Sequence, residues 1–240
     1  PQKLHTSLTD NIRLFKDLLP INKSFDIITR ELSLGSTACY FIGMNGMCDL
    51  QTIFFLFAEI EAKKFPIQTT DNPSVLPQFI KDQFLYAQIT FSDSPKEMIQ
   101  NLLSGPCLLL IDGYEQALII DTRKYPSRSV EEPDTEKTIR GARDGFVETM
   151  LFNTNLIRRR IRNPKLIFEP QTIGSDSMTD VAIGYVEGVA DMQLVEKVKQ
   201  EMKNMDVIFG PVHAEQVKPM ASFAQKNNVR LVVPFSSKGE

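Results

Sequence analysis

Two glycine–aspartate pairs with the same spacing constrain the fold of this chain more than any other feature. Gly46 follows an apolar run and precedes Asp49, and the pair Gly188 and Asp191 repeats this arrangement with the same gap. Glycine allows the sharp turn that ends a strand, and aspartate at a helix start accepts hydrogen bonds from the first unpaired backbone amides. Each pair therefore predicts a strand, a turn and a helix.

Strand–turn–helix units share this pattern in all α/β proteins, so one match would carry little weight. Here a second signal agrees, because Leu34-Gly35 precedes the first unit and Ile173-Gly174 precedes the second. The common order of turn, strand, turn and cap favours a duplication. The sequence thus predicts an α/β fold of two similar lobes, each a small mixed sheet flanked by helices.

Hydrophobic periodicity, caps and breakers divide the chain into helices and strands. Helices are predicted near residues 10–19, 49–60, 94–104, 144–161, 191–205 and 214–226, and strands near 25–32, 38–44, 84–91, 107–111, 117–120, 166–173, 181–186, 207–209 and 229–235. The helix near 144–161 is expected to begin at Asp144 and to bury its apolar residues, Phe146, Val147, Met150, Leu151, Ile157 and Ile161. The lobes are placed at 1–121 and 144–240, with a charged linker at 122–143 and a final β-α-β unit at 206–237.

The composition of the 240 residues argues against several classes of function. The net charge of −3 gives no general attraction to nucleic acid. Three cysteines without a paired spacing indicate buried thiols in a reducing compartment, and two isolated histidines form no metal or catalytic set. No phosphate-binding glycine motif occurs. No apolar run reaches the ~20 residues of a membrane span. We therefore expect a soluble, non-enzymatic chain without cofactors.

The charged segment between residues 121 and 162 is the main candidate for function. An acidic, proline-broken stretch leads through Arg-Gly turns into a helix whose last turn is basic, which suits the helix dipole. The candidate interface residues are Arg128, Glu131, Glu132, Arg140, Arg143, Glu148, Arg158, Arg159 and Arg160. Three interpretations stay open: a solvated helix end, a clamp between lobes or subunits, and a contact with anionic lipid.

The run D-T-R-K-Y-P-S-R-S-V-E-E-P-D-T-E-K-T-I-R-G-A-R-D-G-F-V-E, followed by N-T-N-L-I-R-R-R-I-R-N-P, resembles the N-terminal domain of GerA-type spore germinant receptor A subunits. The stretches L-L-L-I-D-G and T-D-V-A-I-G-Y-V-E-G-V-A-D support this, and the likeness covers about residues 6–205. The resemblance implies a two-lobed domain on the cytoplasmic side of the spore inner membrane, with no enzymatic activity. It also implies B and C subunits as partners and a membrane domain in the parent protein, which together convert nutrient binding into germination.

The likeness weakens near Asp206, where the chain resembles one β-α-β unit of a type 1 periplasmic binding protein instead. In that resemblance Ser236 and Ser237 follow the last strand at a ligand cleft, although an exposed C-terminal tail is the favoured interpretation of both residues. A chimera of two families is one interpretation of this change. Two alternative functions follow: a module that binds an amino acid or sugar between its lobes, and a purely structural fusion.

Overall fold

A computed structural model describes residues 2–62, 88–124, 146–174 and 178–203, and the short strands 207–209 and 230–232. The chain forms two compact units, residues 1–168 and 169–240, which are described separately below. In chain order the elements are α1 (Leu8–Leu18), β1 (Ile27–Leu34), β2 (Thr37–Met44), α2 (Leu50–Ala62), β3 (Gln88–Ser92), α4 (Pro95–Leu102), β4 (Cys107–Ile111), β5 (Ala117–Asp121), α5 (Met150–Arg160), β6 (Leu166–Ile173), β7 (Thr179–Val186), α6 (Met192–Lys203), β8 (Val207–Phe209) and β9 (Arg230–Val232).

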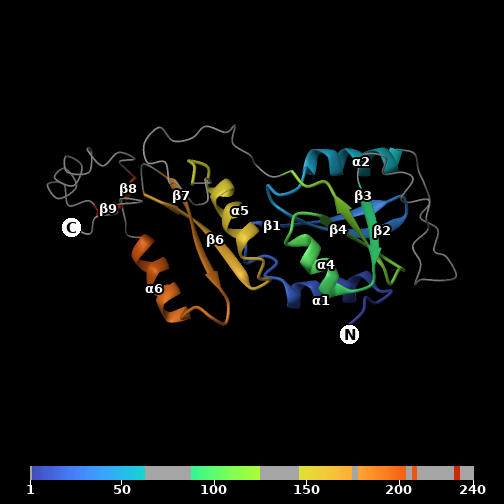
Figure 1. Ribbon diagram of the computed structural model, residues 1–240, viewed down its shortest axis with the longest axis horizontal. Helices are drawn as coiled ribbons and strands as arrows, with labels where there is room; N and C mark the ends of the chain where they lie inside the picture. Colours follow the sequence, from blue (N-terminus) through green and yellow to red (C-terminus); the bar gives the residue numbers. More distant parts are fainter. Residues whose placement is uncertain are drawn as a thin grey trace, which may run out of the picture. The chain divides into compact units, whose positions relative to one another are not determined.

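Unit 1 is built on a five-stranded sheet with the order β1-β2-β4-β5-β3 (Figure 1). Every pairing in this sheet is antiparallel. The strand β4 consists of five buried apolar residues and pairs with β5 across the turn at Asp112 and Gly113, as the sequence predicts for a hairpin. Its central position, between β2 and β5, explains why it has no polar face.

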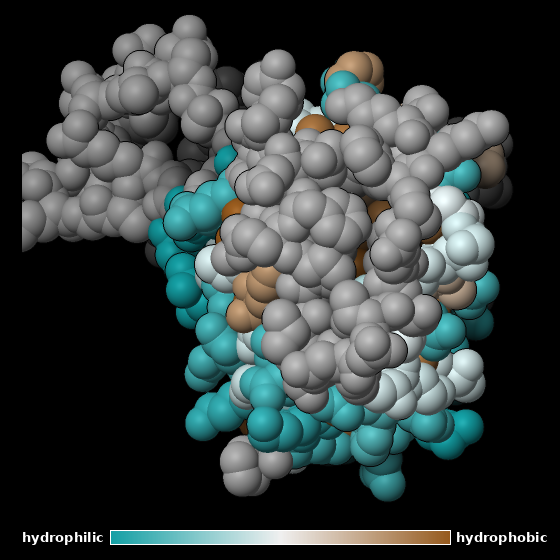
Figure 2. Space-filling view, turned by 90° about the vertical axis from the view of Figure 1, so that its right-hand side faces the viewer, coloured by the Kyte–Doolittle hydropathy of each residue, from teal (hydrophilic) through white to brown (hydrophobic). Residues whose placement is uncertain are grey.

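Helices cover both faces of this sheet, so alternate residues of each strand enter different cores. Tyr40 and Ile42 of β2 point to the side of α1 and α4, whereas Phe41 points to α2. Strands β4 and β5 divide in the same way. Figure 2 views the side at the right of Figure 1, and its described surface is largely hydrophilic with separate hydrophobic residues. The α/β class with flanking helices is confirmed.

The sequence signals for two helix starts are largely confirmed. Ser94 accepts a hydrogen bond from the backbone amide of Glu97 and Pro95 opens α4, which agrees with the helix predicted near 94–104. The Glu97 carboxylate accepts a hydrogen bond from the hydroxyl of Ser92 at 2.5 Å. This bond ties the first turn of α4 to the end of β3. Helix α1 is capped by Ser7, whose hydroxyl accepts from the Asp10 amide, so the helix starts slightly before the predicted range of 10–19.

Unit 2 contains the two-stranded sheet β6-β7, the helix α6, and the strands β8 and β9. Lys199 of α6 reaches the Glu169 carboxylate of β6 at 2.7 Å, and the Tyr185 hydroxyl of β7 also binds Glu169. The pair β8 and β9 is parallel, as predicted for a β-α-β unit after residue 206. The residues between them lie outside the described part of the chain.

The boundary between the compact units falls after Phe168, within β6. The helix α5 therefore belongs to unit 1, whereas the predicted second lobe, residues 144–240, included it. Hydrogen bonds between residues 158–168 and residues 24–26 hold α5 and the start of β6 in unit 1. The predicted linker, residues 122–143, lies mostly outside the described ranges.

The two glycine–aspartate pairs occupy equivalent places in the two units. Gly46 and Gly188 both adopt left-handed backbone angles, with φ of 75° and 82°. In each turn the amide one residue after the glycine binds the carbonyl of the last strand residue at 3.1 Å. Asp49 then accepts from the amide of Thr52, and Asp191 from that of Gln193. A strand pair, this turn and a capped helix thus recur in the same order.

Neither unit offers the features of a membrane span or a metal centre within the described residues. None of the described helices combines the length and apolarity that crossing a bilayer requires. The same ranges hold no cluster of three or more His, Cys, Asp or Glu side chains placed to bind a metal. The three cysteines are buried free thiols, which confirms the prediction from their spacing.

Candidate functional site

The helix α5 buries polar residues in unit 1 and leaves large apolar residues exposed. Its buried side chains are Thr154, Asn155 and Arg158, which share one face at helical spacing. Phe146 and Ile161 are 51% and 44% exposed, so the prediction that they face inward is wrong. One cause is that α5 starts at Met150, so Phe146 is not part of the helix. Another is that the helix turns Arg158 inward, because this buried arginine needs a partner of opposite charge.

That partner is Asp26, the residue directly before β1. The Arg158 Nε donates to Asp26 Oδ2 at 2.8 Å and Nη2 donates to Oδ1 at 3.3 Å, a two-point contact. Both side chains are 0% exposed. The two residues are separated by 132 positions in the sequence, so this ion pair joins the helix after the charged segment to the first strand of the sheet.

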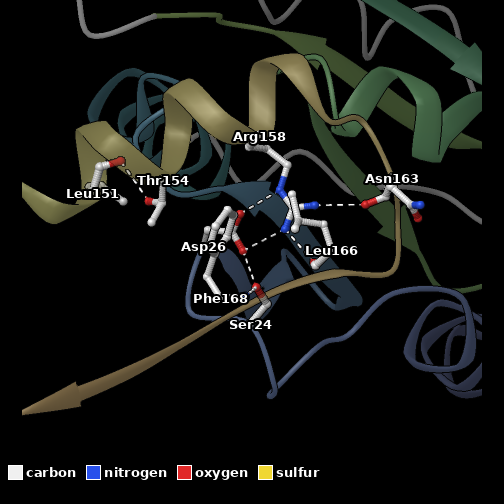
Figure 3. Close-up of polar contacts among 8 residues, drawn as sticks. All are labelled: Ser24, Asp26, Leu151, Thr154, Arg158, Asn163, Leu166 and Phe168. Carbon is white, nitrogen blue, oxygen red and sulfur yellow. Dashed lines mark hydrogen bonds and ion pairs between the residues drawn. The ribbon is translucent and has the colours of Figure 1, made fainter. Parts of the chain in front are cut away.

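Two further hydrogen bonds join the Arg158 guanidinium to backbone carbonyls that follow α5. Nη1 donates to the carbonyl of Asn163 at 3.0 Å, and Nη2 donates to that of Leu166 at 2.8 Å (Figure 3). The guanidinium carbon also lies 5.3 Å from the centre of the Phe168 ring. One side chain thus fixes the end of α5, the turn after it and the start of β6.

Ser24 completes the network from the opposite side. Its hydroxyl donates to Asp26 Oδ1 at 2.5 Å and accepts from the Phe168 amide at 2.8 Å. The Phe25 amide donates to the Phe168 carbonyl at 3.1 Å, and the rings of Phe25 and Phe168 meet edge to face. The Asp26 carbonyl accepts from the Asn45 amide at 2.8 Å, which ties the network to the turn after β2.

A fully buried ion pair of this kind specifies an arrangement more than it stabilises the protein. Removing two charges from water costs several kcal/mol per ion, which the mutual attraction and extra hydrogen bonds offset. Loss of one partner leaves the other charge buried without compensation. The network therefore favours one position of α5 over alternatives in which either charge would be unpaired.

A second contact places α5 against the glycine turn of unit 1. A methyl group added at Gly46 would lie 2.4 Å from Asn155 Nδ2 and 3.2 Å from the Leu151 side chain. Both amide atoms of Asn155 are buried and have no hydrogen-bond partner among the described residues. In the described part of the chain, no atoms lie within 4 Å of such a methyl at the equivalent glycine of unit 2, Gly188. Close approach of α5 is therefore specific to the first turn.

The structure separates the predicted interface residues into three groups. Arg158 is buried against Asp26, a residue that the sequence analysis did not single out. Arg159, Arg160 and Glu148 are exposed. The others lie outside the described residues, as do the candidate ligand residues: Arg128, Glu131, Glu132, Arg140, Arg143, Ser236 and Ser237. The clamp and the small-ligand site stay predictions.

Comparison with known proteins identifies the relatives of this chain. A family model described as "Bacillus/Clostridium GerA spore germination protein" matches residues 15–222. Stage V sporulation protein AF of Bacillus subtilis is 36% identical over 205 residues, which are 85% of this chain and 41% of that protein. Spore germination protein KA of the same species is 30% identical over 210 residues, 86% of this chain and 38% of that protein.

One solved structure shares the fold. The N-terminal domain of the A subunit of the Bacillus megaterium spore germinant receptor GerK3 matches with a TM-score of 0.67 and 23% identity, over 98% of this chain and 83% of that one. The family match continues to residue 222, beyond the predicted departure at Asp206. The chain spans about two-fifths of the length of the curated relatives above.

Proposed function

Because this chain belongs to the GerA family of spore germination proteins, we propose that it is a receptor domain that transmits a nutrient signal during germination. The finding that carries this proposal is the buried Arg158–Asp26 network, which joins the helix after the charged segment to the core of unit 1. Such a network converts displacement of one segment into strain at another.

The proposed route begins in the charged segment and passes through α5. A pull on that segment acts on α5, and Arg158 carries it to Asp26 at the start of β1 and to Leu166 at the start of β6. Leu166 is the first residue of β6 and Asp26 directly precedes β1, and both strands move as units because ladder hydrogen bonds fix their register. No bond chemistry is required of any residue in this route, in keeping with a family described by germination and not by a reaction.

The proposed partners are the other subunits of a germinant receptor, of B and C type, and the membrane domain of the parent protein. One solved relative is named as an A subunit, and another relative is named as a membrane protein. These names suggest that the domain works beside a membrane, which we place at the cytoplasmic side of the spore inner membrane. The clamp formed by Arg140 and Arg143 with linker carboxylates belongs to the same proposal.

A variant that removes both buried charges tests transmission separately from folding. In the full-length protein, Arg158→Met combined with Asp26→Leu removes both members of the pair, and such exchanges of buried ion pairs are often close to neutral for stability. We expect normal accumulation of the protein and slower germination, measured as loss of spore absorbance after addition of nutrient.

The exposed ion pair on α1 supplies a matched control. Arg13 and Asp10 lie 3.5 Å apart with largely exposed side chains, and Arg13→Gln with Asp10→Asn should leave germination unchanged. Germination of the buried-pair variant at the rate of the parent, with equal protein levels, would contradict the proposed route.

A further inference from the structure

Two of the three buried cysteines meet beside the end of β2. Cys107 is the first residue of β4 and Cys48 lies in the turn after β2, and both belong to the hydrophobic core that α2 covers. A methyl group added at Gly43 would lie 3.3 Å from Cys107 Sγ. Cys48 Sγ lies 3.3 Å from the carbonyl oxygen of Met44. Both sulfur atoms are therefore held against consecutive residues of one strand.

A hydrogen bond joins the two thiols and makes them chemically different. This bond lowers the pKa of the Cys48 thiol, whereas the same bond and burial raise the pKa of the Cys107 thiol. Cys48 therefore supplies the thiolate, which is the reactive form of a cysteine. Cys48 is 6% exposed and Cys107 is 0% exposed, so the more reactive sulfur is also the more accessible one.

The third cysteine lies apart from this pair. In the register of β2 with β4, Cys39 stands opposite Ile111, which is four residues from Cys107 at the other end of β4. Four residues of strand span about 13 Å, whereas a disulfide requires Cα atoms within about 7 Å of each other. Cys39 is therefore too far from Cys107 to form a disulfide, and it provides an internal control.

We propose that Cys48 and Cys107 form a redox modification site, which a hydroperoxide converts to a disulfide within the folded chain. The Cys48 thiolate attacks a peroxide oxygen, the O–O bond breaks, and Cys48 becomes a sulfenic acid as water or an alcohol leaves. The Cys107 sulfur then attacks the Cys48 sulfur, the S–O bond breaks, and the hydroxide leaves with the Cys107 proton as water. The two thiols lose two electrons and two protons, which reduce hydrogen peroxide to two waters.

The disulfide would fasten the turn at Gly46 to the central part of the sheet. Cys48 is two residues after Gly46, and Leu151 and Asn155 of α5 lie against that glycine. A covalent bond from Cys48 to β4 therefore restricts local opening of the turn that α5 contacts. This modification is independent of the signalling role proposed above, because it requires neither a nutrient nor a partner subunit.

Oxidation of the folded 240-residue chain with hydrogen peroxide tests the site directly. Alkylation in urea should then find one free thiol in place of three, and the intact mass should fall by that of two hydrogen atoms. Peptide mapping should find Cys48 joined to Cys107, and dithiothreitol should restore all three thiols. Hydrogen exchange of the Met47 and Asp49 amides, both hydrogen-bonded in the turn, should slow about threefold or more in the oxidised chain.

The three cysteines permit matched control variants. Cys39→Ala should form the disulfide as the parent chain does, whereas Cys48→Ala and Cys107→Ala should form none. Circular dichroism melting checks that each variant folds. Because Cys48 lies in a turn, Cys48→Ala keeps the test decisive if Cys107→Ala, within the sheet, does not fold.

Three thiols that survive a peroxide dose sufficient to oxidise the urea-unfolded chain would overturn the proposal. So would a disulfide through Cys39, or oxidation of Cys48 that dithiothreitol does not reverse and that leaves Cys107 free. Unchanged exchange of the Met47 and Asp49 amides after the disulfide has formed would overturn the proposed restriction of the turn. None of these readouts involves germination, so their failure is distinguishable from failure of the signalling role.

Discussion

At the scale of single residues, Arg158 and Asp26 dominate the behaviour expected of this domain. Replacing Asp26 by asparagine keeps the shape of the side chain but leaves the guanidinium charge buried without a counter-ion. We expect a loss of about 3–5 kcal/mol in the free energy of unfolding, measured by urea denaturation. The double replacement Arg158→Met with Asp26→Leu should recover most of it. A loss below about 1 kcal/mol for Asp26→Asn would contradict full burial of the pair.

The cysteine thiols provide a second residue-scale prediction. Burial raises the pKa of the Cys39 thiol to about 12, and Cys39, Cys48 and Cys107 are all buried. Because the thiolate is the reactive species, a soluble disulfide reagent at neutral pH should label Cys39 of the folded chain slowly and should label three thiols once urea unfolds it. Rapid labelling of Cys39 in the folded chain would show that its site is open to solvent.

Sequence reasoning found the local residues and missed the long-range pair. Local roles could be predicted from neighbouring residues, because the contacts involved join positions close together in the sequence. This holds for Ser94, Pro95 and Gly46. Nothing near Asp26 marks a partner 132 positions later. A usable signal existed on the helix, since Thr154, Asn155 and Arg158 place three polar residues on one face. The apolar residues of the same helix outweighed that signal in the prediction.

At the scale of elements, the side-chain contacts of Glu169 with Lys199 and Tyr185, which join α6 to the β6-β7 pair, should weaken at alkaline pH. Burial and the hydrogen bond to the Glu169 carboxylate raise the pKa of Tyr185 to about 12. Burial opposes the charge of Lys199, but its bonds to Glu169 and Glu196 outweigh this and raise its pKa as well. Both raised values mean that their contribution to stability is full below pH 10 and is lost as the pH rises through about 12.

Ultraviolet titration checks this prediction. The tyrosinate absorbance of the parent chain should include one late-ionising group that Tyr185→Phe removes. Glu169→Gln should lower the pKa of Tyr185 toward the ordinary value of 10, because it removes a negative charge. If the tyrosine absorbance that Tyr185→Phe removes belongs to a group that ionises near pH 10, the contact with Glu169 does not hold in solution.

The two equivalent glycine turns permit a matched comparison of the same substitution. Alanine at either position adopts a strained left-handed backbone, at a cost of about 1 kcal/mol. At Gly46 the new methyl also meets Asn155, which adds roughly 1–3 kcal/mol for an overpacked site. Urea unfolding should therefore show a larger loss for Gly46→Ala than for Gly188→Ala. Equal losses would mean that α5 does not lie close to the first turn.

The order of elements was well predicted, and their packing was not. Strand β6 has the predicted bounds, Leu166–Ile173, because apolar runs and turn residues mark both ends. The antiparallel pairing of β2 with β4 joins strands that have α2, β3 and α4 between them in the sequence, so local patterns could not specify it. The start of α5 was also missed, since Thr149 makes no side-chain cap hydrogen bond.

At the scale of the whole molecule, unit 1 should fold without the residues that follow it. A fragment ending at Phe168 keeps Arg158, Ser24 and the contacts that hold the start of β6. We expect it to melt cooperatively in circular dichroism. A fragment of residues 169–240 loses the first three residues of β6 and should be markedly less ordered. A non-cooperative transition for the first fragment would show that unit 1 depends on unit 2.

The position of the unit boundary inside β6 limits how such proteins can exchange parts. A crossover between two relatives after residue 168 would create a hybrid strand, whose first three residues come from one parent and whose last five come from the other. In the hybrid, Phe168 would pack against Phe25 of the same parent, while Glu169 would bind Tyr185 of the other parent. The two halves of one strand would then depend on partners from different sequences. Successful recombinants are therefore expected to inherit this strand whole, from a single ancestor.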